Sequence, residues 1–171
     1  MTRSDITVNL NGKGAHCALN GLYLLAQKEH CDQHTKIYHR VPHGTSQQIY
    51  KGLIADCAHA VFNGQVIVHK DAQKTNAEQR NKNILLSPTA QVDTKPQLEI
   101  YADDVKCAHS STVGQLDEEA LFYLQTRGIN RQNALALLTQ AFAQEIADRI
   151  PAKNIQQDLA ACLWEKLQSM H

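Results

Sequence analysis

The chain has 171 residues, of which 43% are hydrophobic and 20% charged, a composition that supports one substantial core and argues against disorder. Its 17 Lys and Arg residues balance 17 Asp and Glu residues, so it lacks the basic surplus of a nucleic-acid binder, and it has no basic amphipathic helix for a membrane surface. No stretch approaches the roughly 20 apolar residues of a membrane span. Five widely spaced cysteines favour free thiols in a reducing, cytoplasmic setting over a disulfide-rich secreted domain.

The chain divides near Gly114 into a β-rich part, residues 1–114, and a helical part, residues 115–171. The β-rich part opens almost directly in a strand pattern, which suggests a domain truncated at its N-terminal end. Its apolar runs are rich in Val, Ile, Tyr and Phe and recur about every 12–15 residues, close to the spacing of all-β folds. The runs span residues 6–10, 18–26, 35–41, 47–55, 60–68, 82–87 and 97–107.

Three Asn-Gly pairs, Asn11-Gly12, Asn20-Gly21 and Asn63-Gly64, offer the positive φ that tight turns require. They suit the hairpins of an antiparallel sandwich, and they equally suit the corners of a parallel β-helix with stacked coils. The pattern alone fits both architectures, and the greater frequency of sandwiches favours the first.

The helical part contains signals for three helices. Asp117, followed by two glutamates, is a candidate N-cap of the first helix, and Arg127-Gly128 suits its C-terminus. Asn130 is a candidate cap of the second helix, which Pro151 ends, and a third helix is expected over residues 155–168. Apolar residues spaced by three and four form the stripes of the last two helices: Leu135, Leu138, Phe142, Ile146 and Ile150, then Leu159, Leu163 and Leu167 with Trp164 beside them.

Cys107-Ala108-His109 is the first candidate site. Residues two apart on a strand point to the same side, so Val105, Cys107 and His109 share one face. A thiolate and an imidazole suit iron, zinc or an iron–sulfur cluster, but two ligands make only half a site. The other half would come from another segment or another chain. Spacing alone favours the alternative interpretation, a small buried thiol beside a hydrogen-bonded histidine.

Histidines are concentrated at the start of the chain, where seven of the nine lie within the first 69 residues. Cys31 and His34 have the spacing of half a zinc site, but no matching second pair follows at a suitable distance. On a strand, His30, Asp32 and His34 would face together, away from Cys31. We interpret this segment as a polar sheet surface, and a stand-alone metal-binding protein remains the alternative.

Signals for an enzyme are weak. Asp103 and Asp104 are adjacent and would point to opposite faces of a strand, so they would not form an acid–base dyad. A nucleophile elbow, a P-loop and a dinucleotide-binding glycine motif are all missing from the sequence. A β-helix carbohydrate-active enzyme would need clustered carboxylates and several aromatic residues, and aromatic residues make up only 5% of the chain. We therefore predict a protein that is not an enzyme.

Several long segments resemble the SufB/SufD family of iron–sulfur cluster assembly proteins. They are DTKPQLEIYADDVKCAHSSTVGQLDEEALFYLQTRGI (93–129), HRVPHGTSQQIYKGLIAD (39–56), VFNGQVIV (61–68) and AQKTNAEQRNKNILLS (72–87). The resemblance covers nearly the whole chain, although family members are considerably longer. The sequence VKCAH at 105–109 is similar to SufD, whereas SufB resembles Val-Glu-His-Glu-Ala there.

The resemblance implies a right-handed parallel β-helix over residues 1–114 followed by a small helical domain over residues 115–171. It overrules the preference for a sandwich and places the Asn-Gly pairs at coil corners. A β-helix cut at a coil exposes open edge strands, which tend to pair. We therefore expect a homodimer when the chain is isolated.

The resemblance also implies a function. The chain would be a non-catalytic scaffold of the SufBCD complex, pairing with a SufB-type subunit through the β-helix and with the SufC ATPase through the helical domain. No cofactor would be bound stably by this chain alone, and an iron–sulfur cluster would assemble at the SufB–SufD interface. His109 and, less directly, Cys107 match the family positions at that interface and are the candidate ligands.

Overall fold

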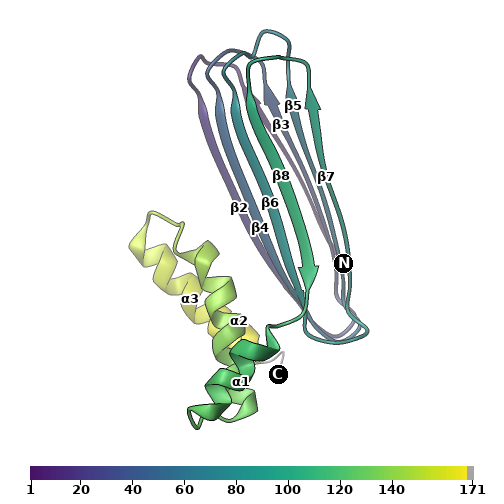
Figure 1. Ribbon diagram of the computed structural model, residues 1–171, viewed down its shortest axis with the longest axis vertical. Coiled ribbons are helices and arrows are strands. Elements are labelled where there is room, and N and C mark those ends of the chain that lie inside the picture. The colour runs from purple at the N-terminus through teal and green to yellow at the C-terminus, as the bar shows by residue number, and fades with distance from the viewer. Residues whose placement is uncertain (169–171) are drawn as a thin grey trace.

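The computed structural model describes residues 1–168, which form eight strands followed by three helices. The strands make two four-stranded parallel sheets, one in the order β1-β3-β5-β7 and the other in the order β2-β4-β6-β8. One strand from each sheet makes a coil, and the stacked coils form a flattened β-solenoid (Figure 1). The strands are β1 (Thr2–Leu10), β2 (His16–Leu25), β3 (His30–His39), β4 (Thr45–Ile54), β5 (His59–Val68), β6 (Asn76–Leu85), β7 (Gln91–Ile100) and β8 (Lys106–Gly114).

The predicted parallel β-helix followed by helices is confirmed, and the sandwich that the pattern alone favoured is wrong. Each strand pairs in parallel with the strand two further along the chain, so consecutive strands lie in opposite sheets. Short apolar runs do not distinguish this arrangement from antiparallel hairpins, because both need strands and turns of similar length.

Only one Asn-Gly pair lies at a coil corner. Asn11-Gly12 is in the turn between β1 and β2, but Asn20-Gly21 lies within β2 and Asn63-Gly64 within β5, so the corner prediction is wrong for these two pairs. Gly21 and Gly64 have no side chain, which leaves space for side chains of other strands to pack against them. A Cβ at Gly21 would be 2.3 Å from the Tyr50 ring, and one at Gly64 would be 2.4 Å from the Gln79 amide.

Alternate side chains of every strand point into the solenoid, as the two-residue period of a strand requires. Phe62 and Ile37 are fully buried in two apolar clusters that fill most of the interior. The interior also contains polar side chains with no exposed surface, among them Gln48, Gln79 and His39. Because a buried polar group is costly without a hydrogen bond, these residues are informative about how the coils fit together.

The helices are α1 (Glu118–Thr126), α2 (Arg131–Ala147) and α3 (Lys153–Gln168), and their predicted caps are confirmed. The Asp117 carboxylate accepts the backbone N–H groups of Glu119 and Ala120 in α1, and the Asn130 side-chain oxygen accepts that of Asn133 in α2. Gly128 follows α1 with a φ of 86°, the left-handed conformation expected after a helix. None of the helices within residues 1–168 is long and apolar enough to span a membrane.

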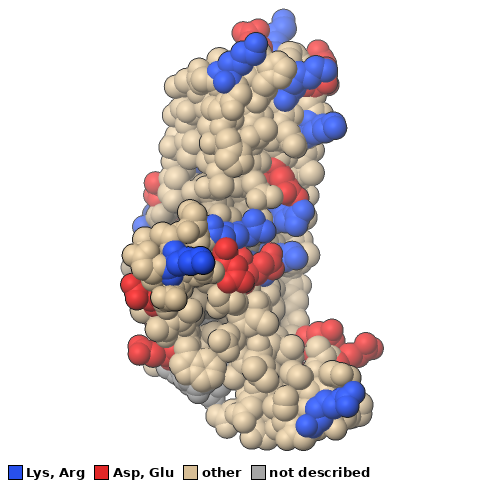
Figure 2. Space-filling view, turned by 90° about the vertical axis from the view of Figure 1, so that its left-hand side faces the viewer, with Lys and Arg blue, Asp and Glu red and all other residues tan. Residues whose placement is uncertain are grey.

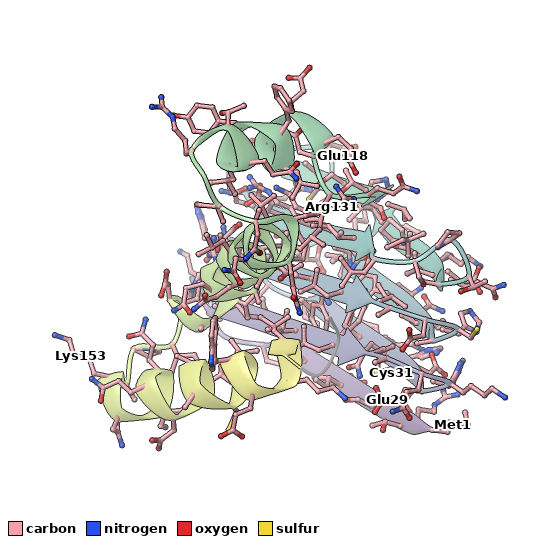
Figure 3. All side chains as sticks on the ribbon, turned by 90° about the horizontal axis from the view of Figure 1, so that it is seen from below. Met1, Glu29, Cys31, Glu118, Arg131 and Lys153 are labelled. Carbon is pink, nitrogen blue, oxygen red and sulfur yellow. The ribbon has the colours of Figure 1, made fainter. Side chains whose placement is uncertain are left out.

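The helices pack on the outer face of the β2-β4-β6-β8 sheet, with α1 beside the last strands and α3 across the first strands (Figures 1 and 3). Leu53 of β4 is fully buried against Ala143 and Ala147 of α2 and Leu163 and Leu167 of α3. The small residues Ala143 and Ala147 of α2 make its closest contacts with the sheet. Of the apolar stripe predicted for this helix, only Ile146 is buried, and the other members are half-buried.

A charged contact joins β4 to α2. Lys51 is only 2% exposed, and its ammonium group donates to the Phe142 carbonyl at 3.0 Å and to the Glu145 carboxylate. The ammonium also lies over the Phe142 ring, 4.2 Å from its centroid. This hydrogen bond from Lys51 lowers the pKa of Glu145, so the ion pair stabilises the contact between helix and sheet.

Candidate functional site

The last coil, formed by β7 and β8, leaves the C-terminal end of the solenoid open. β7 pairs with β5 and β8 pairs with β6, and no strand within residues 1–168 pairs with their opposite edges. Such an edge presents unpaired backbone N–H and C=O groups. Inward-facing apolar residues of this coil are consequently exposed, with Ile100 at 41% and Val113 at 47%.

Cys107 and His109 lie on the inward-facing side of β8, at this open end. Their register partners on β6 are Ala77 and Gln79, which are both buried in the solenoid. Cys107 is half-buried, and His109 is exposed because no further coil covers it. The two side chains therefore share one face, in the geometry that their spacing predicted.

Burial raises the pKa of the Cys107 thiol, and this effect outweighs a weaker opposing effect of the Ala77 backbone N–H. The thiol is thus protonated at neutral pH, and any metal ion that bound it would have to displace the proton. Cys17 lies in the same inward column at the first coil, and burial raises its pKa too. The open end thus holds a thiol whose pKa is raised by burial.

Thiolate sulfur and imidazole nitrogen are ligands that iron–sulfur clusters accept. Within residues 1–168, no group of three or more His, Cys, Asp or Glu side chains is arranged to hold a metal ion. Cys107 and His109 therefore fit one part of a ligand set whose remaining members would have to come from outside the described residues.

Asp103 and Asp104 are exposed in the turn between β7 and β8 and do not lie on a strand. The Asp104 carboxylate pairs with Lys74, and its backbone N–H donates to the Gln73 side-chain oxygen at 3.0 Å. The contacts of Asp104 thus hold two successive turns together.

The histidines of the first half do not combine with Cys31. Cys31 is buried in the interior, whereas Asp32 and His34 lie on the outer face of β3, with His34 Nε2 2.8 Å from Asp32 Oδ1. On the same outer face, His30 contacts His59 with ring centroids 4.9 Å apart. The Cys31–His34 spacing therefore does not form half of a zinc site.

Sequence reasoning missed the polar residues that lie inside the solenoid. Gln79, Asn81 and Asn83 all point inward from β6, and each is at most 2% exposed. The sequence signal that could have revealed these inward-facing residues was their spacing of two, the period of a strand. In the last coil, Thr94 and Ser111 join β7 to β8 across the interior, with their hydroxyl oxygens 2.8 Å apart.

The model of the SufBD core domain, described as SUF system FeS cluster assembly, matches residues 1–142 of the chain. The chain belongs to the SufBD family. It is 40% identical over 165 residues to the iron–sulfur cluster assembly protein SufD of Escherichia coli (strain K12), which covers 96% of this chain and 39% of that protein. The predicted resemblance to this family, and to SufD within it, is confirmed.

Two further SufBD relatives agree. A SufBD family protein of Synechocystis is 39% identical, over 95% of this chain and 36% of its own length. The chloroplastic protein ABCI7 of Arabidopsis thaliana is 37% identical, over 90% of this chain and 33% of its own length. The chain therefore spans less than half the length of the curated relatives that it matches.

Proposed function

We propose that this chain acts in iron–sulfur cluster assembly as a non-catalytic scaffold, within a complex of the SufBCD type. The observation that carries the proposal is the placement of Cys107 and His109 together at the open end of the solenoid. A scaffold that shares a nascent cluster with a partner needs ligands at an edge that the partner can reach, and this end provides them.

The partner at this edge is a SufB-type subunit. Its own edge strand would continue the ladders of β7 and β8, because free N–H and C=O groups favour such pairing. The same contact would bring the partner's ligands to Cys107 and His109 and complete the set that this chain lacks.

The helices are proposed to dock a SufC-type ATPase. Their exposed side chains include large apolar ones, and the lower part of the face in Figure 2 is mainly uncharged. Isolated exposed apolar residues are common, but several on adjacent helices favour a protein contact. They are Phe122, Tyr123, Leu137, Ile155 and Trp164. The Lys51–Glu145 contact would transmit a movement of α2 to β4.

In isolation, the open edge is proposed to pair with a second copy of this chain. Light scattering should then report a dimer for the wild type. Val113→Lys places a charge on the inward side of the edge and should give a monomer, while Thr112→Lys, on the outward side, should remain dimeric. A monomeric wild type would count against edge pairing.

The test of the cluster role is co-expression of the protein with SufB-type and SufC-type partners under anaerobic conditions. We expect Cys107→Ala and His109→Ala to lower the iron–sulfur absorbance of an intact complex, with the larger loss for His109. Cys17→Ala and His16→Ala are matched controls, since both residues lie on β2 in the first coil, far from the open end, and should leave the absorbance unchanged. Full absorbance in both edge variants would place all ligands on the partner.

A further inference from the structure

Three buried polar side chains form a hydrogen-bonded chain with a direction. The Gln48 amide Nε2 donates to the Thr35 hydroxyl, and the Gln79 amide Nε2 donates to Gln48 Oε1 at 2.8 Å. None of the three is more than 1% exposed. Gln79 on β6 therefore directs its donor toward Gln48 of the earlier coil, and Gln48 directs its donor across the interior to Thr35, on the facing sheet of its own coil.

The hydrogen-bonded series from Thr35 through Gln48 to Gln79 ends at an acceptor oxygen without a partner. Gln79 Oε1 is buried and accepts no hydrogen bond from the described residues. A buried acceptor in this state destabilises a fold, so a donor is expected nearby. Gln48 Oε1 is satisfied by Gln79, its register partner in the next coil, and the register partner of Gln79 in the last coil is His109. Adjacent strands lie about 4.8 Å apart, which an imidazole side chain can span.

Packing fixes the direction in which the Gln79 amide points. A Cβ at Gly64 would lie 2.4 Å from Gln79 Nε2, so the amide occupies space that only a glycine leaves. Exchanging its oxygen and nitrogen would set two acceptor oxygens, of Gln79 and Gln48, against each other. Thr94 and Ser111 are also inward in the last coil, but they bond to each other and neither is in register with Gln79.

We propose that Gln79 is a positioning residue for His109. Once the His109 ring turns inward from its exposed position, Gln79 Oε1 accepts one of its ring N–H groups, which fixes the imidazole tautomer and directs the other ring nitrogen to the open edge as a ligand. Metal-binding histidines commonly donate their second N–H to an oxygen acceptor in this way. The ligand role of the outer nitrogen rests on the proposed function, whereas the Gln79–His109 hydrogen bond does not.

The hydrogen bond is tested by long-range ¹H–¹⁵N NMR of the histidine side chains in the full chain, with the His109 signals assigned by their loss in His109→Gln. We expect a single neutral tautomer in the wild type and a mixture of both in Gln79→Leu. Thr94→Val, which removes a different polar contact of the last coil, should keep the single tautomer.

A mixed tautomer in the wild type would overturn the proposal, and so would an unchanged single tautomer in folded Gln79→Leu. The wild-type spectrum decides by itself if Gln79→Leu does not fold, and Gln79→Met then offers a second variant of similar size.

A second measurement separates this inference from the function on which part of it rests. In the complex with its partners, Gln79→Leu should lower iron affinity by about 10–100-fold, the usual effect of removing such a supporting contact. If His109→Ala keeps its full cluster while the tautomer is fixed, the ligand role fails and the hydrogen bond stands. If His109→Ala loses the cluster and the tautomer is mixed, the ligand role stands and the positioning role of Gln79 fails.

Discussion

The middle coils (β3 to β6) and the last coil (β7 and β8) present the same pattern of inward positions but differ in what covers them. Phe62 in the middle is fully buried, whereas Ile100 in the last coil is 41% exposed. Gln79 in the middle is buried in a hydrogen-bonded chain, whereas its register partner His109 is exposed. The comparison teaches that position in the stack, more than residue type, separates structural polar groups from groups available to a ligand.

The largest expected effect is on stability in the middle coils. Phe62→Ala should lower the free energy of unfolding by about 3–5 kcal/mol, because it leaves a cavity beside Tyr50, whose ring centroid lies 5.0 Å away. Ile100→Ala should cost about 1 kcal/mol or less, because its side chain is already partly in water. Urea denaturation measures both in a Val113→Lys background, where the open edge should not pair with a second copy. Equal costs in this background would mean that the last coil is covered within the monomer and would break the comparison.

The second prediction concerns His39, which lies in a column with Leu10 and Val68. Burial lowers the pKa of His39 from 6.5 to about 4, and its Nε2 is 2.8 Å from the Ser46 hydroxyl. The unfolded chain binds a proton at higher pH than the folded chain, so this contribution to stability is complete above pH 6.5 and is lost as the pH falls toward 4.

By about pH 5 the loss should reach roughly 2 kcal/mol, and it should be absent in His39→Leu. Urea denaturation of both proteins at several pH values measures it. A wild type and a variant with the same pH dependence would show that His39 titrates alike in the folded and unfolded states.

Much of the fold could be predicted from local sequence. Asp117, Asn130 and Gly128 mark helix ends through short-range hydrogen bonds and backbone conformation, which need no tertiary context. The polar beginnings of β6 and β7 could not be found in this way, since both lack an apolar run. The side chains of β6 alternate between a buried, mostly polar interior and water, and those of β7 alternate between half-buried and exposed positions. The run assigned to residues 97–107 therefore joined the end of β7 to the start of β8.

The candidate site could be predicted in part. The spacing of Cys107 and His109 gave their common face, because a strand imposes it locally. Gln79 could not be connected to His109, since their neighbourhood depends on the register between β6 and β8, and the turn between β6 and β7 and the turn between β7 and β8 set that register together. The roles of Gly21 and Gly64 likewise depend on side chains of other strands, Tyr50 of the next coil for Gly21 and Gln79 of the facing sheet for Gly64.

The third prediction compares two glycines. Gly64→Ala in the middle coils should cost about 1–3 kcal/mol, because the new methyl group would meet the Gln79 amide and the Phe62 ring. Gly114→Ala in the last coil should cost almost nothing, because nothing lies within 4 Å of its added Cβ. Thermal unfolding of both variants in the Val113→Lys background measures the difference without pairing at the open edge. A similar loss at Gly114 in that background would contradict the open space around it in the structure.

The smallest effect is a difference in thiol reactivity. The cysteines are all free, Cys57 and Cys162 being exposed and Cys17 and Cys107 half-buried. Because burial raises the pKa of Cys17 and of Cys107, both should react severalfold more slowly with iodoacetamide near neutral pH than Cys57 does, as mass spectrometry of the labelled protein would report. In the complex with partners and cluster, Cys107 should become fully protected while Cys17 keeps its rate. Equal protection of both would mean that the complex covers Cys17 and Cys107 alike. Protection of Cys107 would then not support a role as a ligand.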